Sequence, residues 1–150
     1  MNRRIRVQIA GQASVLAPPA EVFTALEDPL TLQRSLPRCQ TLVRVEGGYR
    51  ATFSLDGPAV RGVYHGDIRV CTRQAPQSLD FEISLAGAAG GVTATVQTRL
   101  EPSAEGTRVR YRAQAELGGA LATFGRRALG GLVSLLCRQF FEGVCRETAP

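Results

Sequence analysis

The chain has 150 residues, of which 44% are hydrophobic and 21% are charged, a balance typical of a soluble globular protein. This length is enough for one domain with its own core, and we predict a single domain over residues 1–150. The formal net charge is +5 and every basic residue is an arginine, which allows an anionic membrane, a nucleic acid or an acidic protein as partner and identifies none of them.

Export, membrane insertion and zinc binding are not expected. The N-terminus continues into alternating residues and not into an apolar signal core, which favours the cytoplasm. No run of roughly 20 uninterrupted apolar residues is present. Without CxxC spacing and with a single histidine in the chain, the cysteines are expected to be free thiols in a reducing compartment. They are Cys39, Cys71, Cys137 and Cys145.

The first predicted elements are a strand over residues 4–15 and two short helices. Pro19 suits the first position of a helix, where its missing N–H would have no partner, and Glu21 complements the positive end of the helix dipole. Asp28 is a suitable N-cap for the second helix, which should end before Pro37.

Six further strands are predicted from period-two alternation of apolar and polar residues. They cover residues 41–46, 49–56, 60–70, 79–85, 92–100 and 108–117. The segments between them carry turn residues, such as Gly47-Gly48 and Asp56-Gly57-Pro58. Such a pattern predicts an antiparallel sheet with one face covered and one face in water.

A long helix is predicted over residues 120–145, where the apolar period changes to that of a helix. It would run roughly 35–40 Å, enough to cross the sheet. Glycines inside it, at Gly125, Gly130, Gly131 and Gly143, each cost roughly 0.5–1 kcal/mol relative to alanine. Two explanations stay open: close packing on the sheet, or a helix that bends to admit a ligand.

The covered face of the sheet mixes small and large residues. Small side chains there, including Gly66, Ala94 and Ala115, allow either close helix packing or open space. Bulky residues between them, such as Phe53 and Tyr64, would hold the two layers apart. We therefore predict a partly open apolar cavity between the sheet and the long helix.

The sequence does not predict a catalyst. His65 is the sole histidine, and its position in the alternation places it on the polar face. No Ser-His-Asp or Cys-His arrangement can be built without it, and Asp56, Asp67 and Glu82 also face outward. Gly87 to Gly91 link two strands, whereas a dinucleotide-binding glycine loop leads from a strand into a helix. No cofactor and no metal are expected.

Arginines alternate along the outward face of two predicted strands. Arg108, Arg110 and Arg112 project from the last strand, and Arg4 and Arg6 from the first. A solvated surface is one interpretation, and a merged basic patch is the other. No aromatic residues are interleaved there, so an anionic membrane or an acidic protein fits such a patch better than a nucleic acid does.

The whole chain resembles the carbon monoxide dehydrogenase G-subunit family, within the START/Bet v 1-like (SRPBCC) superfamily. No single motif is specific, but their order along nearly the whole chain is. The matching motifs are Ala17-Pro18-Pro19-Ala20-Glu21-Val22-Phe23 with Asp28-Pro29, Leu36-Pro37-Arg38-Cys39, Gly48-Tyr49-Arg50-Ala51, Val60-Arg61-Gly62-Val63-Tyr64-His65-Gly66, Gly106-Thr107-Arg108-Val109-Arg110-Tyr111, Gly118-Gly119-Ala120-Leu121-Ala122 through Gly125-Arg126, and Phe140-Phe141.

The resemblance implies a helix-grip (Bet v 1-like) α+β fold: a seven-stranded antiparallel sheet wrapped around a long C-terminal helix, with two short helices after the first strand and an apolar cavity inside. It also implies association with a molybdenum-containing CO dehydrogenase-type enzyme, membrane recruitment, and binding of a quinone or lipid. Arg38 stands where the family usually has glycine. The sequence stops at Pro150 without the tail of longer members, which argues against direct membrane anchoring.

Our leading hypothesis is a non-catalytic carrier of a quinone or lipid, cytoplasmic or peripheral to an anionic membrane. Tyr64 and Tyr111 would direct hydroxyls to the ligand's polar group. The predicted cavity lining is Ala51, Phe53, Gly62, Tyr64, Phe81, Ile83, Val96, Tyr111, Ala113, Leu121, Phe124 and Leu132. One alternative is a maturation or recruitment factor for a molybdenum hydroxylase, acting through Arg108, Arg110 and Arg112; another is a cyclase or hydrolase of the same superfamily.

Overall fold

The computed structural model describes residues 4–56 and 61–148. Its seven strands form one antiparallel sheet in the order β1-β7-β6-β5-β4-β3-β2. The strands are β1 (Arg4–Val15), β2 (Cys39–Val45), β3 (Gly48–Leu55), β4 (Gly62–Gln74), β5 (Ser78–Gly87), β6 (Gly90–Ser103) and β7 (Gly106–Gly118). The strand count and the alternation predicted from the sequence are confirmed, whereas Val60 and the turn at Gly57-Pro58 lie outside the described residues.

Two short helices connect β1 to β2, as predicted. They are α1 (Pro19–Glu27) and α2 (Pro29–Ser35). The carboxylate of Asp28 accepts a hydrogen bond from the backbone N–H of Thr31, at 3.0 Å, which caps α2. Leu36 already has an extended backbone, and so α2 ends before Pro37.

The C-terminal segment is not one continuous helix, and the prediction over residues 120–145 was wrong in this respect. A 3₁₀ helix, η1 (Gly119–Phe124), precedes α3 (Gly125–Thr148). Gly125 separates them with φ +81° and ψ 161°, a conformation that is essentially restricted to glycine. The break explains one of the glycines that the sequence places in this helix.

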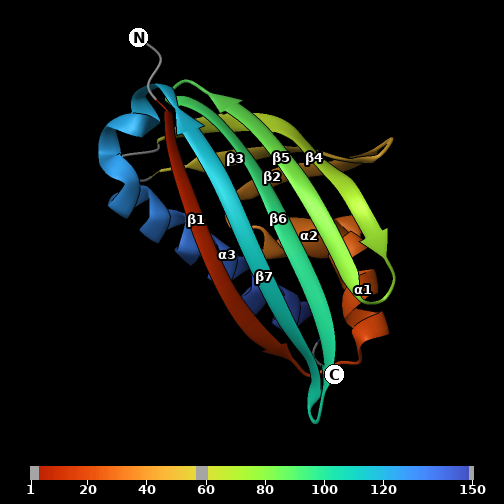
Figure 1. Cartoon of the computed structure of the whole chain (residues 1–150). Helices are drawn as coiled ribbons and strands as arrows, with labels where there is room; N and C mark the ends of the chain where they lie inside the picture. The colour runs from red at the N-terminus through yellow and green to blue at the C-terminus, as the bar shows by residue number, and fades with distance from the viewer. Residues whose placement is uncertain (1–3, 57–60, 149–150) are drawn as a thin grey trace.

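The α-helices of the described residues, α1, α2 and α3, lie on the same side of the curved sheet, and none of them covers the other side (Figure 1). Helix α3 runs along the hollow of the sheet and packs against β1, α1 and α2. This is the helix-grip arrangement that the resemblance implied. The hollow of the sheet therefore contains the whole covered core.

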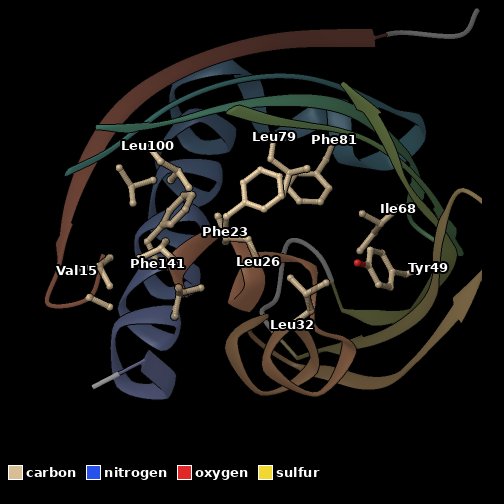
Figure 2. Packing of buried hydrophobic residues seen from close by; sticks show 14 of the residues in the cluster. Val15, Phe23, Leu26, Leu32, Tyr49, Ile68, Leu79, Phe81, Leu100 and Phe141 are labelled. Carbon is tan, nitrogen blue, oxygen red and sulfur yellow. The ribbon is translucent and has the colours of Figure 1, made fainter. Parts of the chain in front are cut away.

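Two apolar clusters form that core. The larger cluster joins α1 and α2 to the sheet and to the C-terminal half of α3, with Phe23, Leu26, Leu79 and Phe141 among its members (Figure 2). The smaller cluster lies at the η1 end. It contains Val7, Tyr64, Ala115, Leu117, Leu121 and Leu129. Phe53 touches both clusters, so the space between them lies on the inner face of the middle strands.

The segment Gly119–Thr148 is long and apolar enough to cross a membrane by length and composition: an 18-residue stretch of it has a mean hydropathy of 1.2, and 22% of that stretch is buried. The expectation drawn from uninterrupted apolar runs did not identify it. In this fold the segment packs against β1, α1 and α2. Many of its apolar residues face the two clusters, whereas Phe124 and Leu135 are exposed. One such helix is weak evidence for a membrane span, and in this fold the helix packs in the hollow of the sheet.

Candidate functional site

A cavity of about 240 Å³ separates α3 from the inner face of β3 to β7. Apolar side chains make up nearly all of its lining; the polar or ionisable members are Tyr64, Thr98 and Cys137. The lining also includes Leu36 and Pro37, which link α2 to β2. A lining of this kind favours hydrocarbon over water.

The cavity exists because the middle of the sheet and the middle of α3 do not reach each other. Ile83, Ala94 and Val96 point inward from the central strands, yet they are only half-buried. Among the described residues of α3, none between 130 and 140 is fully buried. Both layers thus present apolar side chains to a space that protein atoms leave open.

Eight of the twelve predicted lining residues line this cavity. They are Phe53, Tyr64, Phe81, Ile83, Val96, Ala113, Leu121 and Leu132. Their role in ligand binding stays a prediction. We predicted that small inward residues leave open space beside the long helix, and Ala94, Ala113 and Ala115 do line the cavity. Gly66 does not, because a Cβ there would collide with the backbone carbonyl oxygen of Ser84, so this glycine allows close contact between neighbouring strands.

Four predicted lining residues lie elsewhere. Ala51 is fully buried in the larger cluster, and Gly62 faces open space at the start of β4. Phe124 is 42% exposed at the end of η1, directly before the break at Gly125. Tyr111 points inward, but its ring stacks on that of Phe141 with centroids 4.5 Å apart, so it packs the core beside the cavity.

Sequence reasoning missed several lining residues that carried a usable signal. Leu85, Val92, Ala94 and Ala115 share the inward alternation of residues that were selected. Leu136 and Phe140 follow Leu132 at helical spacing. Cys137 also follows this spacing, since it lies four residues after Val133 in the same lining. By contrast, Leu36 and Pro37 enter the lining through the tertiary fold, which the local pattern does not encode.

Tyr64 is the most unusual residue of the lining. Its side chain comes from β4 and is 2% exposed, and within the described part of the chain its hydroxyl has no hydrogen-bond partner. Burial raises the pKa of this phenol, so it stays protonated and can donate. Its ring lies over Gly87, where a Cβ would come within 2.6 Å of the ring, so glycine at that position makes room for it.

The other ionisable group in the lining is the thiol of Cys137. Burial raises its pKa to about 11, so at neutral pH it is a thiol and not a nucleophilic thiolate. His65 is exposed on the outer face. Within residues 4–56 and 61–148 no group of three or more His, Cys, Asp or Glu is arranged to hold a metal. This chemistry suits binding and supplies no acid–base pair.

The loop before β2 carries the departure from the family pattern. Arg38 has a φ of +62°, a left-handed conformation in which glycine is favoured. Its backbone carbonyl accepts a hydrogen bond from the N–H of Ser54, at 3.1 Å, and its guanidinium lies 3.2 Å from the carboxylate of Asp56. These contacts hold the loop that presents Pro37 to the cavity.

The predicted arginine surface lies on the bare outer face of the sheet. Strand β1 pairs with β7, so Arg4 and Arg6 do share a face with Arg108, Arg110 and Arg112. Arg4 and Arg6 both pair with Glu116, at 3.9 and 2.8 Å. The carboxylate of Glu116 thereby compensates charge in that corner of the face.

The sequence profile of the carbon monoxide dehydrogenase G-subunit family (CoxG) matches residues 11–149. The chain belongs to this family. A search of curated proteins finds no match.

Several solved structures share the fold of this chain. A conserved protein from Geobacillus kaustophilus is 30% identical, with a TM-score of 0.85 over 99% of this chain and 95% of that one. A putative uncharacterized protein from Rhizobium leguminosarum, 12% identical, has a TM-score of 0.72 over 99% and 97% of the two chains. Ara h 8.0201, 14% identical, has a TM-score of 0.67 over 95% and 97%. The latter two show the fold alone, and the last confirms that the CoxG-family chain has the Bet v 1-like fold.

Proposed function

We propose that this CoxG-family protein is a non-catalytic carrier that holds one apolar molecule, a quinone or a lipid, in the cavity between the sheet and α3. The observation that carries the proposal is an apolar cavity in the middle of the core that contains one buried hydroxyl without a partner. Folding leaves apolar space unfilled and one buried hydroxyl unpaired. A ligand with an apolar body and one polar group would fill the space and pair with the hydroxyl.

Affinity would come from hydrocarbon burial and orientation from Tyr64. Each 100 Å² of apolar ligand surface removed from water contributes about 2.5 kcal/mol before the costs of binding. The Tyr64 hydroxyl would donate to a carbonyl, ester or hydroxyl oxygen, groups that quinones and many lipids carry. A long tail exceeds a volume of about 240 Å³ and would emerge from the cavity.

A catalytic role has less support. A cyclase or hydrolase needs a group that transfers protons or attacks substrate inside the cavity. Among the described lining residues the titratable side chains are Tyr64 and Cys137, and burial keeps both protonated at neutral pH. Neither has an acid or base beside it in the lining.

The family name supports association with a CO dehydrogenase-type molybdenum enzyme, to which we propose that the protein delivers or presents its ligand. A carrier for quinone or lipid must exchange with a bilayer, so we place it in the cytoplasm with peripheral contact to an anionic membrane. Recruitment or maturation of the enzyme is the second candidate, and the arginine surface favours it.

Native mass spectrometry of freshly purified protein, before and after organic extraction, tests the carrier function. We expect a one-to-one complex whose extra mass is extractable and matches a quinone or lipid. Protein that carries no such molecule, and that takes up neither ubiquinone nor phospholipid when these are added after extraction, would overturn the proposal.

A further inference from the structure

The bare outer face of the sheet has a hollow of its own, unconnected with the apolar cavity. It has a volume of about 520 Å³ and lies across β1, β7 and β6. We call it the arginine groove. It is lined by Ala10, Gly11, Gln12, Gln97, Arg99, Arg110, Tyr111 and Arg112.

Strand register explains the shape of the arginine groove. Arg112 on β7 is flanked by Ala10 on β1 and Gln97 on β6, and Arg110 is flanked by Gln12 and Arg99. Long side chains therefore stand beside the short side chain of Ala10. Figure 1 shows that no helix of residues 4–56 and 61–148 covers this side of the sheet, which leaves the arginine groove accessible to a partner.

Positive charge in and beside the groove exceeds the available carboxylates. Arg99 lies 2.6 Å from Asp80, and Arg110 lies 2.9 Å from Glu101. Among the described residues, neither Arg108 nor Arg112 forms an ion pair. Arg99 and Arg110 are also directly opposite each other in the register, an arrangement of like charges that costs free energy.

We propose that the arginine groove docks an extended acidic segment of a partner protein. Arg108, Arg110 and Arg112 stand on one face of one strand at intervals of roughly 6.8 Å, and an extended peptide presents alternate side chains at the same interval. Carboxylates on alternate residues would thus meet successive guanidinium groups, which bind carboxylates through paired hydrogen bonds.

The surface chemistry separates this partner from a membrane and from a nucleic acid. Gln12, Gln97 and Gln114 flank the arginines, and no large aliphatic side chain lines the groove to enter a bilayer. The aromatic residue in the lining, Tyr111, has its ring stacked on Phe141 in the interior, so the described lining offers no aromatic ring on which a base could stack. Glutamines instead supply donors and acceptors for the backbone of a bound peptide.

The test uses the full chain and a fluorescein-labelled octapeptide in which glutamate alternates with serine. We expect binding that weakens with added salt, since the Debye length is about 8 Å at 0.15 M ionic strength. Arg108→Glu/Arg112→Glu should weaken binding by about tenfold or more. Chemical-shift changes in the ¹⁵N spectrum should follow β1, β7 and β6.

Controls make each outcome decisive. Arg127→Glu, on the exposed face of α3, makes the same kind of charge change away from the groove and should leave peptide affinity within twofold. Ligand content by mass spectrometry should be unchanged in the double variant, which separates this surface from the cavity. The proposal is overturned if the octapeptide with glutamine for glutamate binds equally well. It is also overturned if Arg112-dependent binding is seen only with inorganic phosphate or with phosphatidylserine vesicles.

Discussion

At the scale of single residues, the unpaired hydroxyl of Tyr64 affects stability and binding in opposite directions. A buried hydroxyl without a partner costs about 1–3 kcal/mol. Tyr64→Phe removes it and keeps the ring, so we expect the free energy of unfolding of the ligand-free protein to rise by about 1 kcal/mol. Affinity for a ligand with a carbonyl oxygen should fall by about tenfold, because one hydrogen bond is lost. Urea unfolding and ligand titration measure the two effects.

Tyr49 offers a matched control on the neighbouring strand. Its hydroxyl is also buried, but it donates to the backbone oxygen of Glu27 at 2.6 Å. Tyr49→Phe deletes the same atom and should lower the free energy of unfolding by about 1 kcal/mol without changing ligand affinity. If Tyr64→Phe destabilises the ligand-free protein as much as Tyr49→Phe does, the Tyr64 hydroxyl is paired in solution and its assigned role fails.

The thiol of Cys137 reports on the cavity through its pH dependence. Its pKa of about 11 means that the reactive thiolate is scarce at pH 8 and increases about tenfold for each pH unit until the pKa is reached. In a variant with the other three cysteines replaced by alanine, we expect slow modification by iodoacetamide at pH 8. The rate should rise toward pH 11 and should drop when the cavity is occupied. Rapid modification at pH 8, unaffected by ligand, would contradict the burial of this thiol.

At the scale of secondary-structure elements, Gly125 decides where α3 begins. Its φ of +81° and ψ of 161° are costly for any side chain by about 1–3 kcal/mol. Gly125→Ala should therefore lower the free energy of unfolding by that amount, measured by chemical denaturation. Gly131 is the matched control, because it lies inside α3 and a Cβ there would meet open space. Gly131→Ala should raise stability by up to about 1 kcal/mol.

The strands of this fold are largely readable from the sequence, and the C-terminal helix is less so. Alternation identifies inward residues such as Val96 and Ala113 because one side of the sheet is bare and the other covered. Apolar spacing after Gly119 fits a helix equally well on either side of Gly125, so it cannot reveal a break that depends on one backbone conformation. Phe124, the last residue of η1, is 42% exposed and lies outside the cavity lining.

The cavity lining is only partly predictable for a related reason. Alternation along a strand tells which way Tyr111 points. It does not tell that the ring of Phe141 stacks on the ring of Tyr111, with the two centroids 4.5 Å apart. Which inward side chains touch a neighbour and which face open space depends on the curvature of the whole sheet. Pro37, in the loop between α2 and β2, enters the lining by that tertiary geometry alone.

At the scale of the whole molecule, the cavity divides the core into two clusters that a ligand would join. A ligand that binds only the folded state stabilises it by RT ln(1 + [L]/Kd), about 2.7 kcal/mol at one hundred times Kd. For a domain of this size that corresponds to roughly 5–10 °C in the unfolding midpoint. We expect the unfolding midpoint to fall by this amount when the protein is stripped of its ligand, and to recover when ubiquinone or phospholipid is added back.

Filling the cavity distinguishes ligand binding from general stabilisation. Ala94→Phe places a ring into the open space, so it should abolish the ligand-dependent shift, and its own burial should leave the stripped protein at least as stable as the wild type. Ala86→Phe adds the same ring to the exposed outer face and should keep the full shift. Calorimetry of both variants, each stripped and then reloaded with ligand, gives the four unfolding midpoints to compare. A ligand-dependent shift that survives in Ala94→Phe would mean that the ligand binds outside this cavity and does not join the two clusters.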